Sequence, residues 1–269
     1  MRKILILLLA LIFIAFMTAV TVPPPKNFKT PIFLINLDNA KWRLNKMQKK
    51  LRTLKFTRVS ATEPKDIVIT YTTKNGKKRY IKDLSMDPKY LYSQKTDWNP
   101  PITIHCSKND KFIWTKKKIL SPGEYGCACS HRKIWQDIVK NKIKYAIIME
   151  DDAHFTLLYK LKLHFLNELL PKNFDFIDLK TQRYSGTKYN MFFDYYNIPN
   201  GKIFWGTEAY IISYEGAKKL LNITSTLDSQ IDLVMGKAIK QKKNSSVPND
   251  FFFKNFSRTR TSPQLCRQL

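Results

Sequence analysis

The residues with the clearest chemical potential are three consecutive carboxylates, Glu150, Asp151 and Asp152, which follow the apolar run Ile147–Met149. Acidic residues are scarce in this chain, with 21 Asp and Glu against 47 Lys and Arg, so an acidic triplet stands out. Sheets of α/β proteins build metal and phosphate sites by delivering carboxylates to the carboxyl ends of their strands. A solvated turn after a strand would also contain such residues, and the triplet alone does not decide between the two interpretations.

Alternation along an extended strand separates the roles within the triplet. Glu150 and Asp152 are two positions apart, so in extended backbone they share a face. They are the natural pair for contacting a ribose and a metal ion, with Asp152 the stronger metal candidate, while Asp151 points away. Carboxylate oxygens of this kind favour a divalent cation such as Mn²⁺ or Mg²⁺.

The first elements of the chain predict a parallel sheet. Residues 31–37 form a continuous apolar run that indicates a buried strand. Asp38 or Asn39 is expected to cap the following helix, in which apolar residues recur at helical spacing from Trp42 to Leu54. A second strand is predicted at residues 56–60, and this β–α–β opening is typical of a parallel sheet covered by helices.

Further elements are predicted after residue 120. Ser121 and Glu124 form a capping box, with Pro122 at the first helical position, for a helix that continues to Lys140. The strand that carries the triplet is predicted at 144–150. The later elements are a helix at 157–170, strands at 174–179 and 207–213, a helix at 214–221 capped by Ser213, and a last helix from Asp228 or Ser229 to about 243.

The predicted domain organisation is one catalytic domain at residues 31–250 with a single sizeable core. Residues 62–120 are polar and rich in Tyr and Lys, and they are expected to be an irregular insertion apart from a possible hairpin around residues 71–76. Residues 251–269 are expected to form a basic C-terminal tail. Because no metal-like spacing of the four cysteines occurs, no zinc site is expected, and their disulfide pairing stays open.

Residues 1–22 are expected to form a signal anchor, followed by a Pro-rich stub at 23–30. No charge interrupts residues 4–20, Arg2 and Lys3 precede them, and the length is close to the roughly 20 residues that cross a bilayer. The expected arrangement is a single-pass type II membrane protein, with the catalytic domain in a Golgi- or ER-like lumen or otherwise extracytoplasmic. If the segment is instead cleaved as a signal peptide, the protein is secreted.

The net charge of +26 favours anionic partners without choosing among them. A basic module that binds nucleic acid or another polyanion is therefore one alternative function. The β–α–β opening argues against it, the basic residues are scattered along the chain, and no nucleic-acid partner is expected. A carboxylate–metal phosphohydrolase is a second alternative, but it would need more His and Asp ligands than the four His residues here supply.

Six motifs in order resemble glycosyltransferase family 25, the group of lipopolysaccharide and collagen-type galactosyl- and glucosyltransferases. They cover about residues 31–61 and 120–236, and each alone is weak. The motifs are Ile35-Asn36-Leu37-Asp38 followed by Arg43, Ser60-Ala61, Gly123–Cys127 leading into Ser130-His131 and Trp135, Met149–Asp152, Ala209–Ser213 with Gly216–Leu221, and Ile231-Asp232. Two features depart from the family pattern: residues 62–120 are longer than its usual connection, and Cys129 replaces an aliphatic residue.

The resemblance implies a GT-A-like fold, in which a Rossmann-type mixed sheet is flanked by helices. It also implies an inverting, metal-assisted enzyme that moves galactose or glucose from a UDP-sugar to a glycan, lipo-oligosaccharide or protein hydroxyl. Inverting transfer needs a base beside the acceptor hydroxyl, and Asp232 is the first candidate, with Asp228 competing. The residues expected to bind the nucleotide-sugar are Asn36, Arg43, Ser130, His131, Glu150 and Asp151, with Asp152 and Glu150 on the Mn²⁺ or Mg²⁺ ion.

Overall fold

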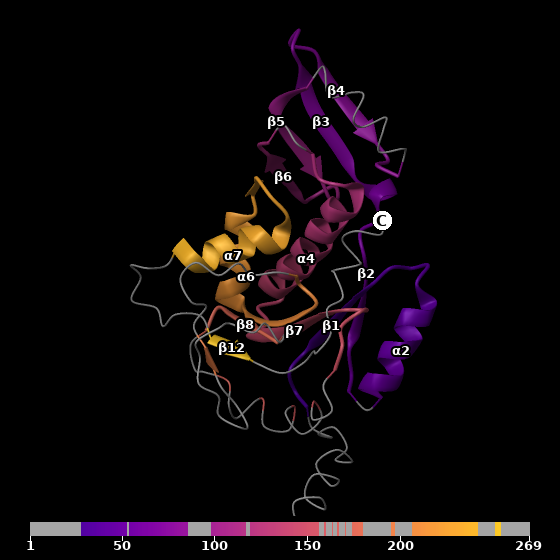
Figure 1. Ribbon diagram of the computed structural model, residues 1–269, viewed down its shortest axis with the longest axis vertical. Helices are drawn as coiled ribbons and strands as arrows, with labels where there is room; N and C mark the ends of the chain where they lie inside the picture. The colour runs from indigo at the N-terminus through magenta and orange to yellow at the C-terminus, as the bar shows by residue number, and fades with distance from the viewer. Residues whose placement is uncertain are drawn as a thin grey trace, which may run out of the picture.

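The structure is a computed structural model that describes residues 28–52, 54–85, 98–116, 119–155, 174–179, 195–196, 206–241 and 251–253, with single positions 159, 163, 166 and 170. Two mixed sheets and several helices make up this part of the chain, an arrangement consistent with the GT-A fold (Figure 1). No helix within these ranges combines the length and apolarity needed to cross a bilayer. The predicted anchor at 1–22 and most of the stub at 23–30 lie outside the described residues.

A seven-stranded sheet carries the predicted acidic strand near its centre, in the order β2-β1-β7-β10-β8-β12-β9. Strands β1 (Ile32–Asn36), β2 (Thr57–Ser60) and β7 (Tyr145–Glu150) are parallel, as the β–α–β opening predicted. β10 (Ala209–Ser213) runs antiparallel to β7 and to β8 (Phe176–Asp178). β12 (Phe251–Phe253) pairs with β8 and with β9 (Tyr195–Tyr196), so the start of the predicted tail belongs to this sheet.

Helices cover both faces of this sheet because its central strands are apolar on both sides. On one face, Ile32 and Leu34 of β1 share a core with Met47 and Leu51 of α2 (Lys41–Leu51). The expected cap is wrong: Ala40 occupies the N-cap position and makes no side-chain hydrogen bond. The helix predicted at 157–170 is described only at single positions, where its helical, buried side chains join the same core: Tyr159, Leu163 and Leu166.

The opposite face of the sheet packs on α4 (Pro122–Lys140), α6 (Tyr214–Ile223) and α7 (Ile231–Gln241). Ser121 and Glu124 form the predicted capping box of α4, and Ser213 accepts a hydrogen bond from Gly216 N as the cap of α6. The last helix begins at Ile231, two or three residues later than predicted. Trp135 is completely buried in the middle of this layer.

Residues 62–120 are not an irregular insertion in the part that the structure describes. They contain a short η1 turn (Pro64–Asp66) and four strands of a second sheet: β3 (Val68–Thr73), β4 (Lys78–Lys82), β5 (Trp98–His105) and β6 (Lys111–Trp114). The predicted hairpin is confirmed as the β3–β4 pair. β11 (Thr226–Leu227) completes the order β11-β6-β5-β3-β4, and the inner side chains of this sheet share one core with α4.

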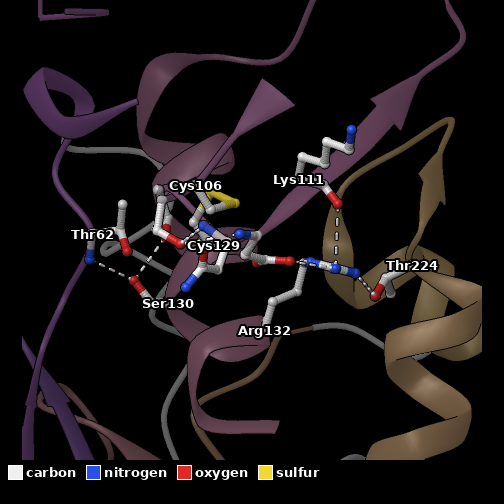
Figure 2. The surroundings of a disulfide bond; sticks show 11 residues. Thr62, Cys106, Lys111, Cys129, Ser130, Arg132 and Thr224 are labelled. Carbon is white, nitrogen blue, oxygen red and sulfur yellow. Dashed lines mark hydrogen bonds and ion pairs between the residues drawn. A yellow bond between two sulfur atoms is a disulfide. The ribbon is translucent and has the colours of Figure 1, made fainter. Parts of the chain in front are cut away.

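A disulfide bond joins the second sheet to α4. Cys106 follows β5, and Cys129 lies in the middle of α4, so the bond explains the departure from the family pattern at Cys129 (Figure 2). Beside it, Arg132 forms a buried ion pair with Asp110 at 2.6 Å and donates to Thr224 Oγ1 at 2.7 Å. These contacts hold the second sheet, α4 and the end of α6 together.

Candidate active site

The topology collects the acidic residues at one edge of the seven-stranded sheet. β1 and β7 are parallel, so Asn36 and Glu150 end at the same edge. β10 is antiparallel to β7, so the residues that precede it, Gly206–Glu208, also lie there. The backbone N–H of Glu150 donates to the carbonyl of Glu208 at 2.9 Å, which continues the strand pairing up to the acidic triplet.

Asp151 connects β7 to the first β–α unit. Its carboxylate accepts a hydrogen bond from Asn36 Nδ2 at 2.7 Å and one from Arg43 Nη1 at 3.3 Å. Burial raises the pKa of Asp151, while Asn36 and Arg43 act to lower it. The structure thus brings three predicted binding residues into one contact, and Asp151 points toward β1 and α2.

Arg58 extends this contact, and the sequence analysis missed it. Its Nε donates to Asn36 Oδ1 at 2.9 Å, and its Nη2 donates to the carboxylate of Asp38. Ser60 Oγ also donates to Asp38, at 2.9 Å, and the hydrogen bonds from Arg58 and Ser60 lower the pKa of Asp38. Arg58 lies in β2, next to β1, so the predicted parallel pairing was the only sequence signal for its position.

Glu150 points to the other side of β7, into a buried polar network. His131 Nε2 lies 3.1 Å from Glu150 Oε1, and the Thr207 hydroxyl donates to the same oxygen. His131 Nδ1 lies 2.8 Å from the hydroxyl of Tyr210, which also accepts a hydrogen bond from Trp135 Nε1 at 2.9 Å. Since Glu150 and His131 are each only 1% exposed, this network fixes the position of Glu150 from inside the core.

The surroundings of His131 favour its protonated, positively charged form. Burial alone would lower the pKa of His131, but Tyr210, Cys127 and Glu150 around it raise that pKa well above its usual value. For Tyr210, burial has the opposite effect: it raises the pKa of the phenol to about 12, so the hydroxyl keeps its proton. An imidazolium beside Glu150 stabilises the ionised form of that carboxylate.

Asp152 has a carboxylate oxygen that the described residues leave unsatisfied. Its Oδ1 is buried and has no hydrogen-bond partner among the residues that the structure describes. Burial, and then the neighbouring carboxylates of Glu150, Asp151 and Glu208, raise the pKa of Asp152 to about 8. Glu208 is a second residue that sequence analysis missed, because only the antiparallel pairing of β10 brings it here.

The prediction that Glu150 and Asp152 share the face of an extended strand is wrong in its geometry. β7 ends at Glu150, and Asp151 and Asp152 lie in a turn. The strand alternation therefore stops before Asp152. The two carboxylates are nevertheless close enough for Glu150 to raise the pKa of Asp152, so they remain neighbours in the site.

The hydrogen bonds of Ser130 are made to backbone groups of Gly126 and Thr62. Its Oγ donates to Gly126 O at 2.7 Å and accepts from Thr62 N at 2.8 Å, and the residue is 2% exposed. These bonds attach the segment after β2 to α4 (Figure 2). The predicted contact of Ser130 with a nucleotide-sugar stays a prediction.

Asp232 reaches the acidic edge through the loop before β10. Its Oδ2 accepts a hydrogen bond from Gly206 N at 2.8 Å, and its Oδ1 accepts one from Leu233 N at 2.8 Å. Gly206 has a φ of +78°, a conformation that side chains with a Cβ rarely adopt. Asp228, the competing candidate, is half-buried at the end of β11 and accepts from Ser229 Oγ at 2.9 Å.

The site therefore concentrates negative charge that a divalent cation can neutralise. Four carboxylates, those of Glu150, Asp151, Asp152 and Glu208, interact electrostatically, and Arg43 is the cation acting on Asp152. The unpartnered buried oxygen of Asp152 and the hard oxygen chemistry of the set fit Mn²⁺ or Mg²⁺. Asp152 would hold such an ion, with Glu208 and Glu150 beside it.

Open α/β sheets bind ligands at the carboxyl ends of their strands, and a carboxylate cluster at that edge suits a divalent cation that also binds phosphate groups. The family profile described as Glycosyltransferase family 25 (LPS biosynthesis protein) matches residues 29–235 of the chain. This is more than half of the sequence and includes the whole acidic edge. The chain belongs to glycosyltransferase family 25.

Similar proteins include longer collagen-modifying enzymes. Procollagen galactosyltransferase 1-A of Xenopus laevis is 27% identical over 220 residues, which cover 76% of this chain and 30% of that protein. Procollagen galactosyltransferase 2 of Mus musculus is 27% identical over 211 residues, 77% of this chain and 29% of that protein. Procollagen galactosyltransferase 1-B of Xenopus laevis is 31% identical over 115 residues, which cover 38% of this chain and 18% of that protein. The chain thus spans less than a third of the length of these relatives.

Proposed function

We propose that this glycosyltransferase transfers a galactose or glucose residue from a UDP-sugar to a hydroxyl of a glycan, lipo-oligosaccharide or protein, with inversion at the sugar carbon. The observation that carries the proposal is the unpartnered buried oxygen of Asp152 among three further carboxylates. Enzymes of this family typically depend on a metal ion. A bound Mn²⁺ or Mg²⁺ would neutralise the diphosphate leaving group as negative charge develops on it.

The residues on the β1 side of the edge are suited to bind the nucleotide part of the donor. Asn36 and Arg43 hold Asp151, and Arg58 holds Asn36 and Asp38. The two guanidinium groups supply positive charge beside a site whose substrate carries a diphosphate. His131 holds Glu150 from within the core, so its proposed contribution to donor binding is to position that carboxylate.

Asp232 is our candidate for the base that takes the proton of the acceptor hydroxyl. Its carboxylate accepts a hydrogen bond from the backbone N–H of Gly206, and the next residue, Thr207, donates a hydrogen bond to Glu150. Asp228 accepts a hydrogen bond from its neighbour Ser229 Oγ at 2.9 Å, at the end of β11. This geometry favours Asp232 over Asp228, although both variants belong in the test.

We also propose that the domain works in an oxidising, lumenal or extracytoplasmic compartment behind its N-terminal anchor. The Cys106–Cys129 disulfide supports this, since such bonds persist in secretory compartments and are rare in the cytosol.

The experiment is product analysis after incubation of the full-length chain with UDP-galactose or UDP-glucose, Mn²⁺ and a panel of glycan, lipo-oligosaccharide and procollagen-peptide acceptors. A new β- or α-linked product, assigned by NMR, identifies transfer, and its anomeric configuration relative to the donor tests inversion. Release of free sugar and UDP at the same rate with and without every acceptor would indicate hydrolysis and contradict the proposal.

A further inference from the structure

The outer face of the second sheet carries exposed lysines and belongs to a different sheet from the acidic edge. In this sheet, side chains alternate between a buried inner face and a solvent face, and the inner positions Ile69, Ile81, Ile104 and Phe112 join the core. We name the opposite side the basic face and define it by its exposed or half-buried polar residues Thr70, Thr72, Lys78, Tyr80, Lys82, Thr103, His105 and Lys111. The half-buried Val68 and Ile113 lie between them.

Cross-strand pairing places these residues in a continuous surface. Tyr80 of β4 is opposite Thr70 of β3, which is opposite Thr103 of β5. Lys82 is opposite Val68, which is opposite His105, and His105 is opposite Lys111 of β6. Lysines therefore stand at both ends of this row, Lys82 on β4 and Lys111 on β6, with Val68 and His105 between them. Burial and the neighbouring Lys111 lower the pKa of His105.

No carboxylate neutralises the basic face within the described part of the chain. The hairpin from Lys74 to Lys82 contains five basic residues and no acidic one, and none of the five forms an ion pair with a described carboxylate. Tyr80 is 67% exposed, and the Lys82 ammonium lies 5.6 Å from the centre of its ring. A ligand on this surface would meet lysines around an aromatic ring, with threonine hydroxyls beside them.

Protection of a sheet edge does not account for this pattern. Lysines on an edge strand such as β4 prevent edge-to-edge aggregation. Lys111 and His105 lie on inner strands, however, and an exposed Tyr at the edge adds apolar surface to it. The basic face has residues on four strands, β3 to β6, so it is a surface rather than a protected edge.

We propose that the basic face is a docking surface for an anionic oligosaccharide, one that carries phosphate, sulfate or carboxylate groups, and that it holds the acceptor away from the transfer site. Aromatic rings pack on sugar rings through their apolar faces, and lysines pair with anionic substituents. A membrane surface fits less well, because Tyr80 is the only large apolar side chain exposed on this face among the described residues. Single-stranded nucleic acid binds to several stacked aromatic rings, and the face has one.

The role of the oligosaccharide as an acceptor rests on the proposed function, but binding to the basic face can be measured without sugar transfer. The test is calorimetric titration of the full-length chain in detergent with a sulfated heparin hexasaccharide, and with neutral maltohexaose as the comparison. The variant is Lys78→Ala/Lys82→Ala, and the matched control is Lys46→Ala/Lys49→Ala, which removes two exposed lysines from α2 and leaves the same net charge. Tyr80→Ala tests the aromatic ring separately.

We expect the sulfated hexasaccharide to bind and the neutral one to bind more weakly. The Lys78/Lys82 variant should lose about tenfold in affinity and show a shallower dependence on salt, while the α2 control stays close to the parent. Tyr80→Ala should weaken both sugars. Equal losses in the two double variants would mean attraction by net charge alone and would overturn the proposal, as would tighter binding of an oligothymidylate at the same residues.

The two proposals fail separately. If the basic face is the docking surface and the chain is a transferase, the Lys78/Lys82 variant should raise the KM for an anionic acceptor and leave donor hydrolysis unchanged. If no donor is ever turned over, the proposed function fails, while the calorimetric result still decides whether the basic face binds anionic oligosaccharides.

Discussion

Asp232 and Gly206 are joined by a hydrogen bond of 2.8 Å between the carboxylate of one and the backbone N–H of the other, across 26 residues of sequence. The next residue, Thr207, donates to Glu150. The start of α7 is thereby connected to the acidic edge through a loop of three residues. The proposed base and the proposed cation site are therefore held by the same segment.

Asp232→Asn should separate proton removal from donor binding. The amide cannot accept the acceptor proton, so the transfer rate should fall by about 10²–10⁴-fold. UDP affinity, measured by calorimetry with Mn²⁺ present, should persist because the amide oxygen can still accept one of the two backbone hydrogen bonds.

Asp228→Asn is the matched control for that prediction. The substitution alters a half-buried carboxylate in the short connection between β11 and α7. This variant should transfer sugar at close to the parent rate. Collapse of transfer at position 228 with near-normal transfer at 232 would assign the base to Asp228. Loss of UDP binding at 232 would make that residue a donor or metal ligand.

Arg43→Ala should weaken donor binding without unfolding the domain. Arg43 donates to the buried Asp151 but lies at the surface end of the contact, with 13% of its side chain exposed. Removing one charge-assisted hydrogen bond should lower UDP-sugar affinity by about ten- to hundredfold. Lys49→Ala, on the exposed side of the same helix, is the control. Unchanged affinity in Arg43→Ala together with a lower stability would restrict Arg43 to a structural role.

The Cys106–Cys129 disulfide should stabilise the attachment of the second sheet to α4. The bond closes a loop with a sequence separation of 23, and replacing both cysteines with Ser should lower the free energy of unfolding by about 2–4 kcal/mol. Denaturant unfolding with and without a reducing agent measures this. The reductant should destabilise the parent and leave the double variant unchanged; equal effects on both would argue that the bond does not form.

Asp152 should make the stability of the metal-free chain depend on pH. Its pKa of about 8 in the folded state exceeds the value of about 4 for an unfolded Asp. The contribution to stability is therefore complete below about pH 4 and is lost as the pH rises through about 8. Unfolding in EDTA across this window should show the decline in the parent and a flatter curve in Asp152→Asn. If stability changed with pH by the same amount in the two proteins, the raised pKa would not belong to Asp152.

Local sequence signals predicted those elements whose pattern is complete within a few residues. The capping box of α4 and the buried strand β7 are of this kind, because Ser121 with Glu124 and the run at 145–149 need no distant partner. The second sheet was missed because its outer face is polar. The alternation of Ile69 and Tyr71 with Thr70 and Thr72 was present but was obscured by the surrounding lysines.

The candidate site could be predicted only in part, for a related reason. The triplet, Asn36 and Asp232 each stood out, but their contacts depend on strand register and on the direction of β10. Arg58 and Glu208 have no local feature that distinguishes them from other surface charges. The alternation rule also failed at Asp152, because it was applied beyond Glu150, where the predicted strand and β7 both end.

The most direct test of the account is Mn²⁺ binding to the acidic edge, measured by electron paramagnetic resonance in the presence of UDP. The full-length parent should bind one Mn²⁺ per chain, and Asp152→Asn should lose that binding while its circular dichroism spectrum stays that of the parent. Transfer should stop in EDTA and return with added Mn²⁺. Mn²⁺ binding by the Asn variant equal to the parent's, or full transfer in EDTA, would contradict the assignment of Asp152 as the ligand of a catalytic cation.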